Sequence, residues 1–231
     1  SSGATQMVRG VVDCPSTYRI AFLGDIQTNP FQFERIVESI AESVRDAPAD
    51  EPPLMALAVV GDLTETSGTD QFELIAEVIE NSAIPVITVP GNHDIFRWDV
   101  ASYNLTFGPG NHVSELCTTR LVMLDTGNAQ LARSVQGRLP GMLEHPEHEH
   151  LILGMHHPPY PKFTGAGWTR EDQAQALLVE AAIAEADLIV VSPGIPLSQP
   201  DLAAARAMGK PMVGELALAA SRLSLPTIAI T

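Results

Sequence analysis

The stretch AVVGDL, residues 58–63, is an apolar run that ends in a glycine and then in a side chain of a type that binds metals. The same arrangement occurs before it in AFLGDIQ, residues 21–27, and after it in VPGNHD, residues 89–94. A fourth apolar run, LILGMHHPPY at residues 151–160, ends in two adjacent histidines. Parallel strands deliver the loops that follow them to one edge of a sheet, so these polar side chains can converge although they are far apart in sequence. The pattern predicts a metal site at that edge.

Short apolar runs alternate with helical patterns along most of the chain. Residues 31–44, FQFERIVESIAESV, carry apolar side chains at the three-to-four spacing of an amphipathic helix, and residues 71–79 and 172–183 repeat this pattern. The alternation favours an α/β layered fold, because strands that are apolar on both sides must be covered on both faces. The predicted strands are residues 19–24, 55–61, 85–90, 120–125, 150–155, 187–192 and 226–230.

The acidic composition limits the partners of the chain. Of its 231 residues, 45% are hydrophobic and 18% are charged, as in a soluble globular protein with one large α/β domain or two small ones. The formal net charge of -15 repels polyanions, so we predict neither nucleic acid nor an anionic membrane surface as a general partner. A small phosphate ester is a compatible partner if metal ions supply local positive charge. The sequence leaves the oligomeric state open.

The sequence also leaves the cellular compartment open. No apolar stretch reaches the ~20 residues that cross a bilayer, so we expect a soluble chain, either cytoplasmic or exported after removal of a signal peptide. Cys14 and Cys117 are too few for a disulfide framework, and neither lies in a metal-ligand pair such as CxxC. We interpret them as ordinary thiols, and a single disulfide is the less favoured alternative.

The side chains that follow the apolar runs are of types that hold divalent cations. Asp25 and Asp62 offer hard carboxylate oxygens that can bridge two cations. Asn92 and His156 offer a neutral oxygen and a nitrogen suited to Zn, Mn or Fe. Two cations held ~3.5–4 Å apart can bind both the attacking and the departing oxygens of a phosphoryl transfer. These residue types therefore suit the hydrolysis of phosphate esters.

The motif GNHD, residues 91–94, is the most informative of these motifs, since Asn, His and Asp in succession offer little to a core and much to a site. We expect His93 to donate a proton or a hydrogen bond to the ester oxygen, with Asp94 orienting it. Taken singly, the other motifs are less specific. An aspartate after a strand is more often a cap or turn residue, and a histidine pair before Pro-Pro is more often structural.

Together, in this order and spacing, the motifs resemble those of the calcineurin-like metallophosphoesterase family over about residues 18–186. The resemblance implies a layered α/β/β/α sandwich that uses one or two divalent ions, Mn, Fe or Zn. It also implies a role for each site residue: Asp25 binds the first metal, Asp62 bridges, Asn92 and His156 bind the second, His93 is the catalytic histidine, and His157 lies beside the site or binds substrate. The matching motifs are GDIQ, GDL, GNHD, YNLTFGP at 103–109, LVMLDT at 121–126 and MHHPPY at 155–160.

Two positions depart from the pattern of that family. Gln27 stands where the first motif, Asp-x-His, has its histidine, which leaves a weaker amide ligand or none. The Gly-His-x-His loop expected after a late strand is replaced by SPGIPLSQP, residues 192–200, and no histidine follows His157. Each of the two metal positions therefore lacks an imidazole. Because complete structural zinc sites are worth ~10–16 kcal/mol, we expect weak or single-metal occupancy.

The tail, residues 186–231, resembles a different family, the end of the N-terminal domain of UDP-N-acetylmuramoylalanine–D-glutamate ligase. The matching features are DLIVVSPGIP, AAARAMGKP, GELALAA and PTIAIT. This change of resemblance suggests a chimeric gene or an engineered fusion. We expect residues 187–231 to add strands and helices to the domain formed by residues 1–186, although backbone amides at 192–194 can receive an anion at a loop-to-helix junction.

Three functions are compatible with the sequence. The leading one is a metal-dependent hydrolase of phosphoric esters, a phosphodiesterase or phosphomonoesterase acting on a small substrate, with an activity reduced by the missing histidine loop. The second is a catalytically inactive binding or scaffold protein that keeps a residual metal site. The third is a nucleotide-sugar-binding module centred on the tail. The ligase reaction is excluded for this chain, because it has no GxxxxGK[ST] sequence to cradle ATP.

Overall fold

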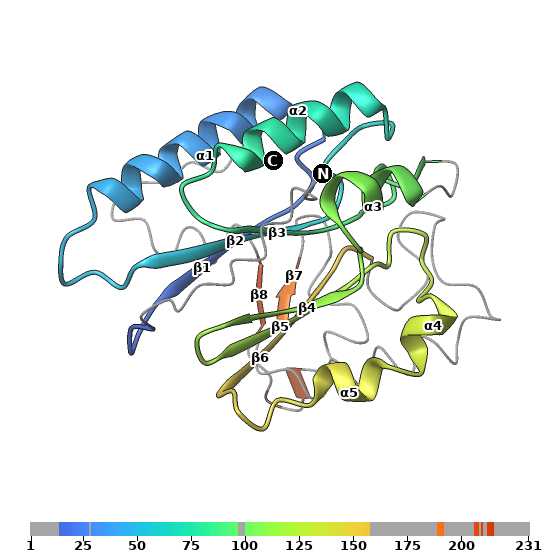
Figure 1. Ribbon diagram of the computed structural model, residues 1–231. Coiled ribbons are helices and arrows are strands. Elements are labelled where there is room, and N and C mark those ends of the chain that lie inside the picture. Colours follow the sequence, from blue (N-terminus) through green and yellow to red (C-terminus); the bar gives the residue numbers. More distant parts are fainter. Residues whose placement is uncertain are drawn as a thin grey trace.

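A parallel three-stranded sheet forms the first half of the fold in the computed structural model (Figure 1). Its strands are β1 (Arg19–Leu23), β2 (Leu54–Val60) and β3 (Val86–Val89), with β2 in the middle. All three strands therefore end at the same edge of the sheet. The structure describes residues 14–27, 29–96, 100–157, 189–191, 206, 207, 209 and 212–214.

A second sheet of mixed direction packs against the first. Its strands are β4 (His112–Leu116), β5 (Thr119–Leu124) and β6 (His150–Met155), in that order. β4 is antiparallel to β5, whereas β5 and β6 are parallel. Farther along the chain, β7 (Ile189–Val191) and β8 (Met212–Gly214) form a separate parallel pair in which β7 contacts β6.

Two helices cover the outer face of the first sheet (Figure 1). α1 (Pro30–Arg45) begins after Asn29, whose side chain caps the helix by accepting the amide of Gln32. α2 (Thr69–Glu80) packs beside α1 and also contacts α3 (Ala101–Phe107). The buried side chains of this layer are Phe33, Val37, Leu57, Val59, Phe72, Ile75, Ile79, Tyr103 and Phe107.

The strand β2 is buried on both faces and so connects the layers. Leu57 and Val59 belong to the core under the helices, whereas Ala56, Ala58 and Val60 belong to the core between the two sheets. This division follows from the alternation of side chains along a strand. The other buried members of the core between the sheets are Ile87, Val89, Leu121, Met123 and Ile152.

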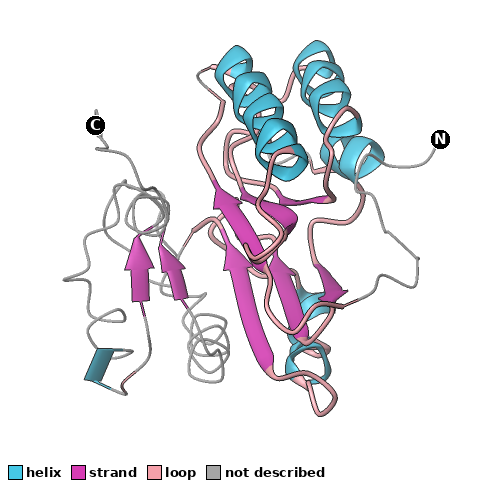
Figure 2. Cartoon of the chain, turned by 90° about the vertical axis from the view of Figure 1, so that its left-hand side faces the viewer, coloured by secondary structure: helices cyan, strands magenta, loops and turns pink. Residues whose placement is uncertain are grey.

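Two short helices, α4 (Arg133–Gln136) and α5 (Leu139–Leu143), cover the outer face of the second sheet. The layer order is therefore helices, sheet, sheet, helices, which confirms the predicted α/β/β/α sandwich (Figure 2). The buried side chains of this outer layer are Val122, Leu124, Leu131, Val135, Leu139, Leu151 and Leu153.

The predicted elements agree with the described structure, apart from the short ones. The helices expected at 31–44 and 71–79 are α1 and α2, and six predicted strands correspond to β1, β2, β3, β5, β6 and β7. The helix expected at 172–183 and the strand expected at 226–230 lie outside the described residues. Sequence analysis missed the strands β4 and β8 and the helices α3, α4 and α5. Helices of seven, four and five residues contain too few turns to show a helical period.

A disulfide joins the N-terminal arm to the turn between β4 and β5. Cys14 and Cys117 are bonded, with Cα atoms 5.4 Å apart and a sequence separation of 103. The arm is also held by the hydroxyl of Tyr18, which donates to the carbonyl of Leu116 and lies 2.5 Å from the hydroxyl of Thr119. The interpretation of the two cysteines as free thiols is therefore wrong. Two residues remote in sequence meet because the arm before β1 passes the turn between β4 and β5.

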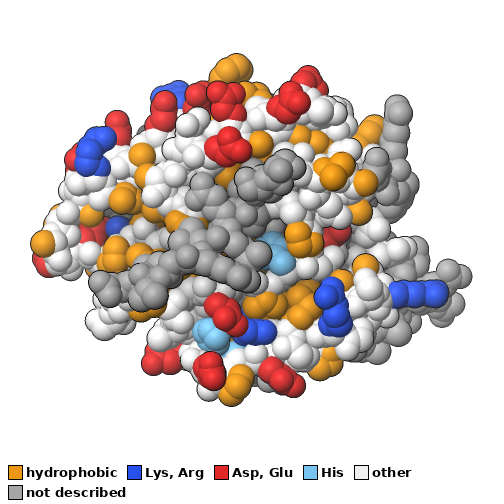
Figure 3. Space-filling view, in the orientation of Figure 1, with side chains coloured by type: hydrophobic (Ala, Val, Ile, Leu, Met, Phe, Trp, Pro, Cys, Tyr) orange, Lys and Arg blue, Asp and Glu red, His pale blue; other side chains and the backbone are white. Residues whose placement is uncertain are grey.

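Acidic side chains cover the layer formed by α1 and α2. Figure 3 shows Asp and Glu spread over the top of the molecule, where these helices lie. This surface agrees with the net charge of -15, while the absence of a polyanionic partner stays a prediction. Within the described ranges, none of the helices is both long and apolar enough to cross a bilayer. The exposed acidic residues of the two helices are Glu34, Glu38, Glu42, Asp70, Glu73, Glu77 and Glu80.

Candidate metal centre

Asp25 and Asp62 occupy equivalent turns after β1 and β2. Both follow a glycine, and both have a left-handed φ of 54°. Aspartate tolerates this backbone region better than most residues, and such strained positions cluster at functional sites. The two turns are joined by a hydrogen bond of 3.1 Å from the amide of Asp25 to the carbonyl of Gly61. They therefore bring two carboxylates from adjacent strands to the same edge of the sheet.

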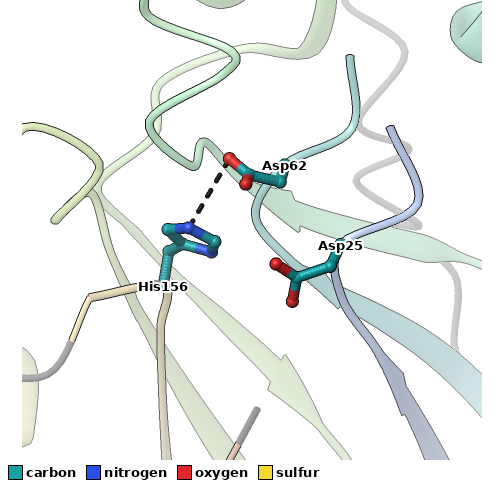
Figure 4. A group of neighbouring side chains, drawn as sticks. All are labelled: Asp25, Asp62 and His156. Carbon is teal, nitrogen blue, oxygen red and sulfur yellow. Dashed lines mark ion pairs between the residues drawn. The ribbon is translucent and has the colours of Figure 1, made fainter. Parts of the chain in front are cut away.

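Four of the predicted ligands meet at this edge. Asp25, Asp62 and His156 offer ligand atoms that all lie within 4.8 Å of one another (Figure 4). Nε2 of His156 is 3.5 Å from Oδ1 of Asp62 and 3.1 Å from Oδ1 of Asn92. Asp62 and His156 are buried, whereas Asp25 is exposed. The structure thus brings together residues that follow β1, β2, β3 and β6, and their role as ligands stays a prediction.

The imidazole of His156 is oriented for binding a cation. Its Nδ1 lies 3.1 Å from the carbonyl oxygen of Val60, and because a carbonyl can only accept, Nδ1 carries the proton. In the neutral ring Nε2 then presents a lone pair toward the oxygens of Asp62 and Asn92. These acceptors repel one another unless a positive charge lies between them. Two carboxylates, an amide oxygen and an imidazole nitrogen fit a divalent cation of the Zn, Mn or Fe type.

Two glycines allow the loops to close around this site. Gly61 has a φ of 99°, and a Cβ at this position would collide with the imidazole of His156. A Cβ at Gly91 would collide with the backbone amide and the carboxylate of Asp62. Only glycine leaves room for these contacts, so Gly61 is required by the close approach of His156 and Gly91 by that of Asp62.

Gln27 holds the carboxylate of Asp62. Its amide nitrogen donates to Oδ2 of Asp62 at 3.3 Å, and its Oε1 is buried without a hydrogen-bond partner. Rotating the amide by half a turn would place Oε1 against the carboxylate, so this orientation is the favourable one. An unpartnered buried oxygen beside two carboxylates fits a nearby cation. Whether Gln27 is itself a ligand stays a prediction.

The ring of His93 is fixed by a residue that sequence analysis did not single out. Nδ1 of His93 lies 2.7 Å from the carbonyl oxygen of Glu65, whose carboxylate is 3.9 Å away, and the amide of His93 donates to Asp62 at 2.9 Å. Burial alone would lower the pKa of the imidazole, but the Glu65 carbonyl and the nearby carboxylates, Asp62 first, raise it overall. The hydrogen bond to the Glu65 carbonyl occupies Nδ1 of His93. About a third of the His93 side chain, 34%, is exposed.

Asp94 has a different position from the one we expected. Its carboxylate is fully buried and does not orient the ring of His93, which is bonded to Glu65. Instead it ties the loop after β2 to the loop after β3. Burial raises the pKa of Asp94 to about 6, although its hydrogen bonds lower it. The donors are the amides of Gly91 at 2.8 Å, Leu63 at 3.0 Å and Thr64 at 2.8 Å, with the Thr64 hydroxyl at 3.0 Å.

His157 packs against His156, with ring centroids 4.7 Å apart. Its amide donates to the hydroxyl of Thr126 at 2.8 Å, and its Nδ1 lies 3.2 Å from the Thr126 carbonyl. Burial lowers the pKa of the His157 imidazole to about 4, so the ring is neutral at neutral pH. The structure thus places His157 beside the metal cluster, and a contact with substrate stays a prediction. Thr126, which is fully buried, is a supporting residue: it ends the LVMLDT motif, but the sequence assigned it no role.

Most of the chain matches the sequence model of one family. Residues 18–191 match the model described as calcineurin-like phosphoesterase. The chain belongs to this family. Family membership implies the use of divalent metal ions. Purple acid phosphatase PPD1 from yellow lupin (Lupinus luteus) seeds has a similar fold, with a TM-score of 0.54 at 15% identity, over 76% of this chain and 37% of the phosphatase.

The C-terminal part matches a second family. Residues 173–214 match the model of the Mur ligase MurD-like N-terminal domain, which overlaps the first match. The predicted combination of two families in one chain is thus confirmed. The anion site predicted at 192–194 lies outside the described residues, and the packing of residues 187–231 into the domain of residues 1–186 stays a prediction.

Curated relatives match short stretches of the chain. UDP-N-acetylmuramoylalanine–D-glutamate ligase of Nitrosococcus oceani is 55% identical over 51 residues, which are 22% of this chain and 11% of the ligase. A probable cyclic nucleotide phosphodiesterase of Fibrobacter succinogenes is 41% identical over 54 residues, 23% of this chain and 18% of that protein. The chain thus spans about a tenth of the ligase's length and less than a fifth of the phosphodiesterase's.

Proposed function

We propose that this chain is a metal-dependent hydrolase of small phosphoric esters. The observation that carries the proposal is the cluster of Asp25, Asp62 and His156, whose ligand atoms lie within 4.8 Å of one another beside the partly exposed imidazole of His93. Membership of the calcineurin-like phosphoesterase family supports the class of reaction. The relative from Fibrobacter succinogenes, a probable cyclic nucleotide phosphodiesterase, supports a diester substrate.

In this proposal, Asp25, Asp62, Asn92 and His156 hold the divalent cation. A divalent cation in such a site polarises phosphoryl oxygens and makes water a usable nucleophile near neutral pH. The protein contributes the geometry. Val60 fixes the imidazole of His156, and Gln27 together with the amide of His93 fixes the carboxylate of Asp62.

His93 is the proposed proton donor to the departing ester oxygen. Its Nδ1 is occupied by the Glu65 carbonyl, so Nε2 is the nitrogen that can share a proton with a bound ester. The nearby carboxylates favour the protonated ring, as a general acid requires. His157, which is neutral at neutral pH, adds no positive charge of its own to the site.

We expect one tightly held cation in each chain. Within the described residues, Asp25, Asp62 and His156 are the one group of three or more His, Cys, Asp and Glu side chains with metal-ligand spacing, and the group contains a single imidazole. A second cation would share Asp62 and lack a nitrogen donor of its own, which weakens its binding. Activity below that of a complete two-metal site is the expected consequence.

Hydrolysis of bis-p-nitrophenyl phosphate with added Mn²⁺ tests the proposal, and p-nitrophenyl phosphate in parallel separates diesters from monoesters. Asp62→Asn keeps the size of the side chain but removes its charge, and we expect the rate to fall by about 100-fold or more. Asp50→Asn makes the same change at an exposed position before β2 and is the matched control. Equal, slow release of product by wild type and Asp62→Asn would instead identify a binding protein that retains part of the metal site.

Elemental analysis of the purified chain tests the number of cations. About one equivalent of Mn, Fe or Zn in wild type, lost in Asp62→Asn and kept in Asp50→Asn, is the expected result. Two tightly held equivalents would show that another side chain supplies the missing nitrogen donor.

A further inference from the structure

The segment from Glu65 to Ser67 holds the loop that carries His93 at two points. At the first point, the carbonyl of Glu65 accepts Nδ1–H of His93 at 2.7 Å. At the second, the hydroxyl of Ser67 donates to the carbonyl of His93 at 2.7 Å and accepts the amide of Phe96 at 2.8 Å. A single hydroxyl group thus bonds both ends of the turn formed by residues 93–96.

Ser67 adopts an unfavourable backbone conformation at this place. Its φ is 57°, where an L residue other than Asn or Asp is disfavoured by roughly 1–2 kcal/mol. Glycine would fit without this cost, yet the glycine of the segment is the next residue, Gly68. Such strain persists where surrounding contacts compensate for it. Here the compensating contacts are the two hydrogen bonds of the Ser67 hydroxyl to the His93 loop.

We propose that Ser67 is a positioning residue for His93. Its hydroxyl fixes the backbone of His93, so that the ring stays bonded to the Glu65 carbonyl. Nε2 then keeps one position, and the neutral imidazole keeps one tautomer. The expected effect on rate rests on the proposed function, whereas the expected effect on the ring does not. Without the hydroxyl, the turn at residues 93–96 loses both bonds and the imidazole gains other orientations.

Thr66 offers a matched control within the same segment. Its amide and its hydroxyl lie 3.0 Å and 3.3 Å from Oε1 of Gln71, so this hydroxyl holds the segment to α2. Ser67 holds the segment to His93 instead. If Ser67 served only to keep the loop in shape, loss of either hydroxyl would have the same effect.

Nitrogen NMR of the histidine rings in the metal-free full-length chain tests the effect on the ring. At a pH alkaline enough to leave the ring neutral, wild type is expected to show His93 as the Nδ1–H tautomer, and Ser67→Gly to show a mixture of tautomers. Ser67→Gly removes the hydroxyl together with the backbone strain, and Ser67→Ala removes the hydroxyl alone, so agreement between them assigns the effect to the hydroxyl. Thr66→Ala is expected to keep the wild-type spectrum.

Kinetics with Mn²⁺ and bis-p-nitrophenyl phosphate test the effect on catalysis. For Ser67→Gly we expect kcat to fall about tenfold, because a small misplacement of a catalytic group is costly, while KM stays within about twofold. Thr66→Ala should match wild type in both. A wild-type ring spectrum in Ser67→Gly, or an equal loss of kcat in Thr66→Ala, would overturn the inference. If wild type releases no product, the proposed function fails, and the spectrum of the metal-free chain still decides on Ser67.

Discussion

The loop after β3 buries Asp94 and the loop after β5 partly buries Asp125, and the two carboxylates have different partners. Asp94 is fully buried and receives hydrogen bonds from two loops of the first sheet. Asp125 accepts the amide of Gly127, within its own loop, at 3.2 Å. Burial raises the pKa of both carboxyl groups to about 6. The electrostatic cost of the two carboxylates is therefore similar. Contacts between loops offset it at Asp94, and a local turn offsets it at Asp125.

The difference lies in what the neighbouring loop offers to each carboxylate, since β2 and β3 are parallel and so are β5 and β6. In the first sheet, all strands are parallel and end at one edge, so the loops after β2 and β3 lie side by side and Asp94 can join them. In the second sheet, β4 is antiparallel to β5, and the neighbour of the β5 loop at this edge is the loop after β6. That loop supplies His156 to the site, while the β5 loop supports His157 through Thr126.

Among the variants we predict, Asp94→Ala should lose the most free energy of unfolding, and more than Asp125→Ala in the β5 loop. Asp94→Ala leaves three buried backbone amides and a threonine hydroxyl without their acceptor, and we expect a loss of about 4 kcal/mol in the free energy of unfolding. Asp125→Ala removes the acceptor of one amide and should cost about 1 kcal/mol. Urea denaturation measures both. Equal losses would show that the two aspartates have equivalent roles.

A disulfide cross-links the first sheet to the second, because it ties the arm before β1 to the turn before β5. Its sequence separation is 103, and a disulfide typically stabilises a fold by about 3 kcal/mol. Cys14→Ser with Cys117→Ser should lower the unfolding midpoint accordingly. A reductant should lower the midpoint of wild type to that of the double variant and leave the double variant unchanged. An unaltered wild-type midpoint in reductant would argue against the bond.

The electrostatic cost of Asp125 in the β5 loop can be measured from the pH dependence of the free energy of unfolding. Because burial raises the pKa of Asp125 in the folded state to about 6, from the 3.8 usual for an aspartate, the folded state binds more protons than the unfolded state between these values. The contribution of Asp125 is therefore favourable below pH 4 and is lost as the pH rises through 6. Relative to Asp125→Asn, wild type should lose about 2 kcal/mol between pH 4 and pH 6.5 in urea denaturation. A constant difference across this range would contradict the assignment, and Asp50→Asn is the exposed control.

The smallest expected effect concerns the support of His157. Thr126→Val keeps the shape of the buried side chain but removes the hydroxyl that accepts the amide of His157, and we expect a loss of about 1 kcal/mol in the free energy of unfolding. The control is Thr106→Val, because the hydroxyl of Thr106 donates to a carbonyl within helix α3. This variant should lose less free energy of unfolding. If the two variants lose the same stability, the β5 loop contributes no specific support to the site.

Much of the first sheet could be predicted from sequence, because each of its strands lies in an apolar run that is followed by a motif. The helices α1 and α2 also show a clear apolar period. By contrast, β4 and the short helices around β5 have too few residues for a period to emerge. Contacts made by main-chain atoms were equally hidden, since any residue at position 65 could offer the carbonyl that holds His93.

The amino-acid sequence by itself determined the layered class of the fold, the combination of two families, and which side chains could form the metal site, because apolar periodicity and residue type are local properties. The tertiary structure alone decided how those side chains are supported. It showed that Asp94 joins two loops and that Glu65 and Ser67 hold the loop of His93. It also showed that Cys14 and Cys117 form a disulfide. These relations depend on distances across the fold, which spacing along the chain does not encode.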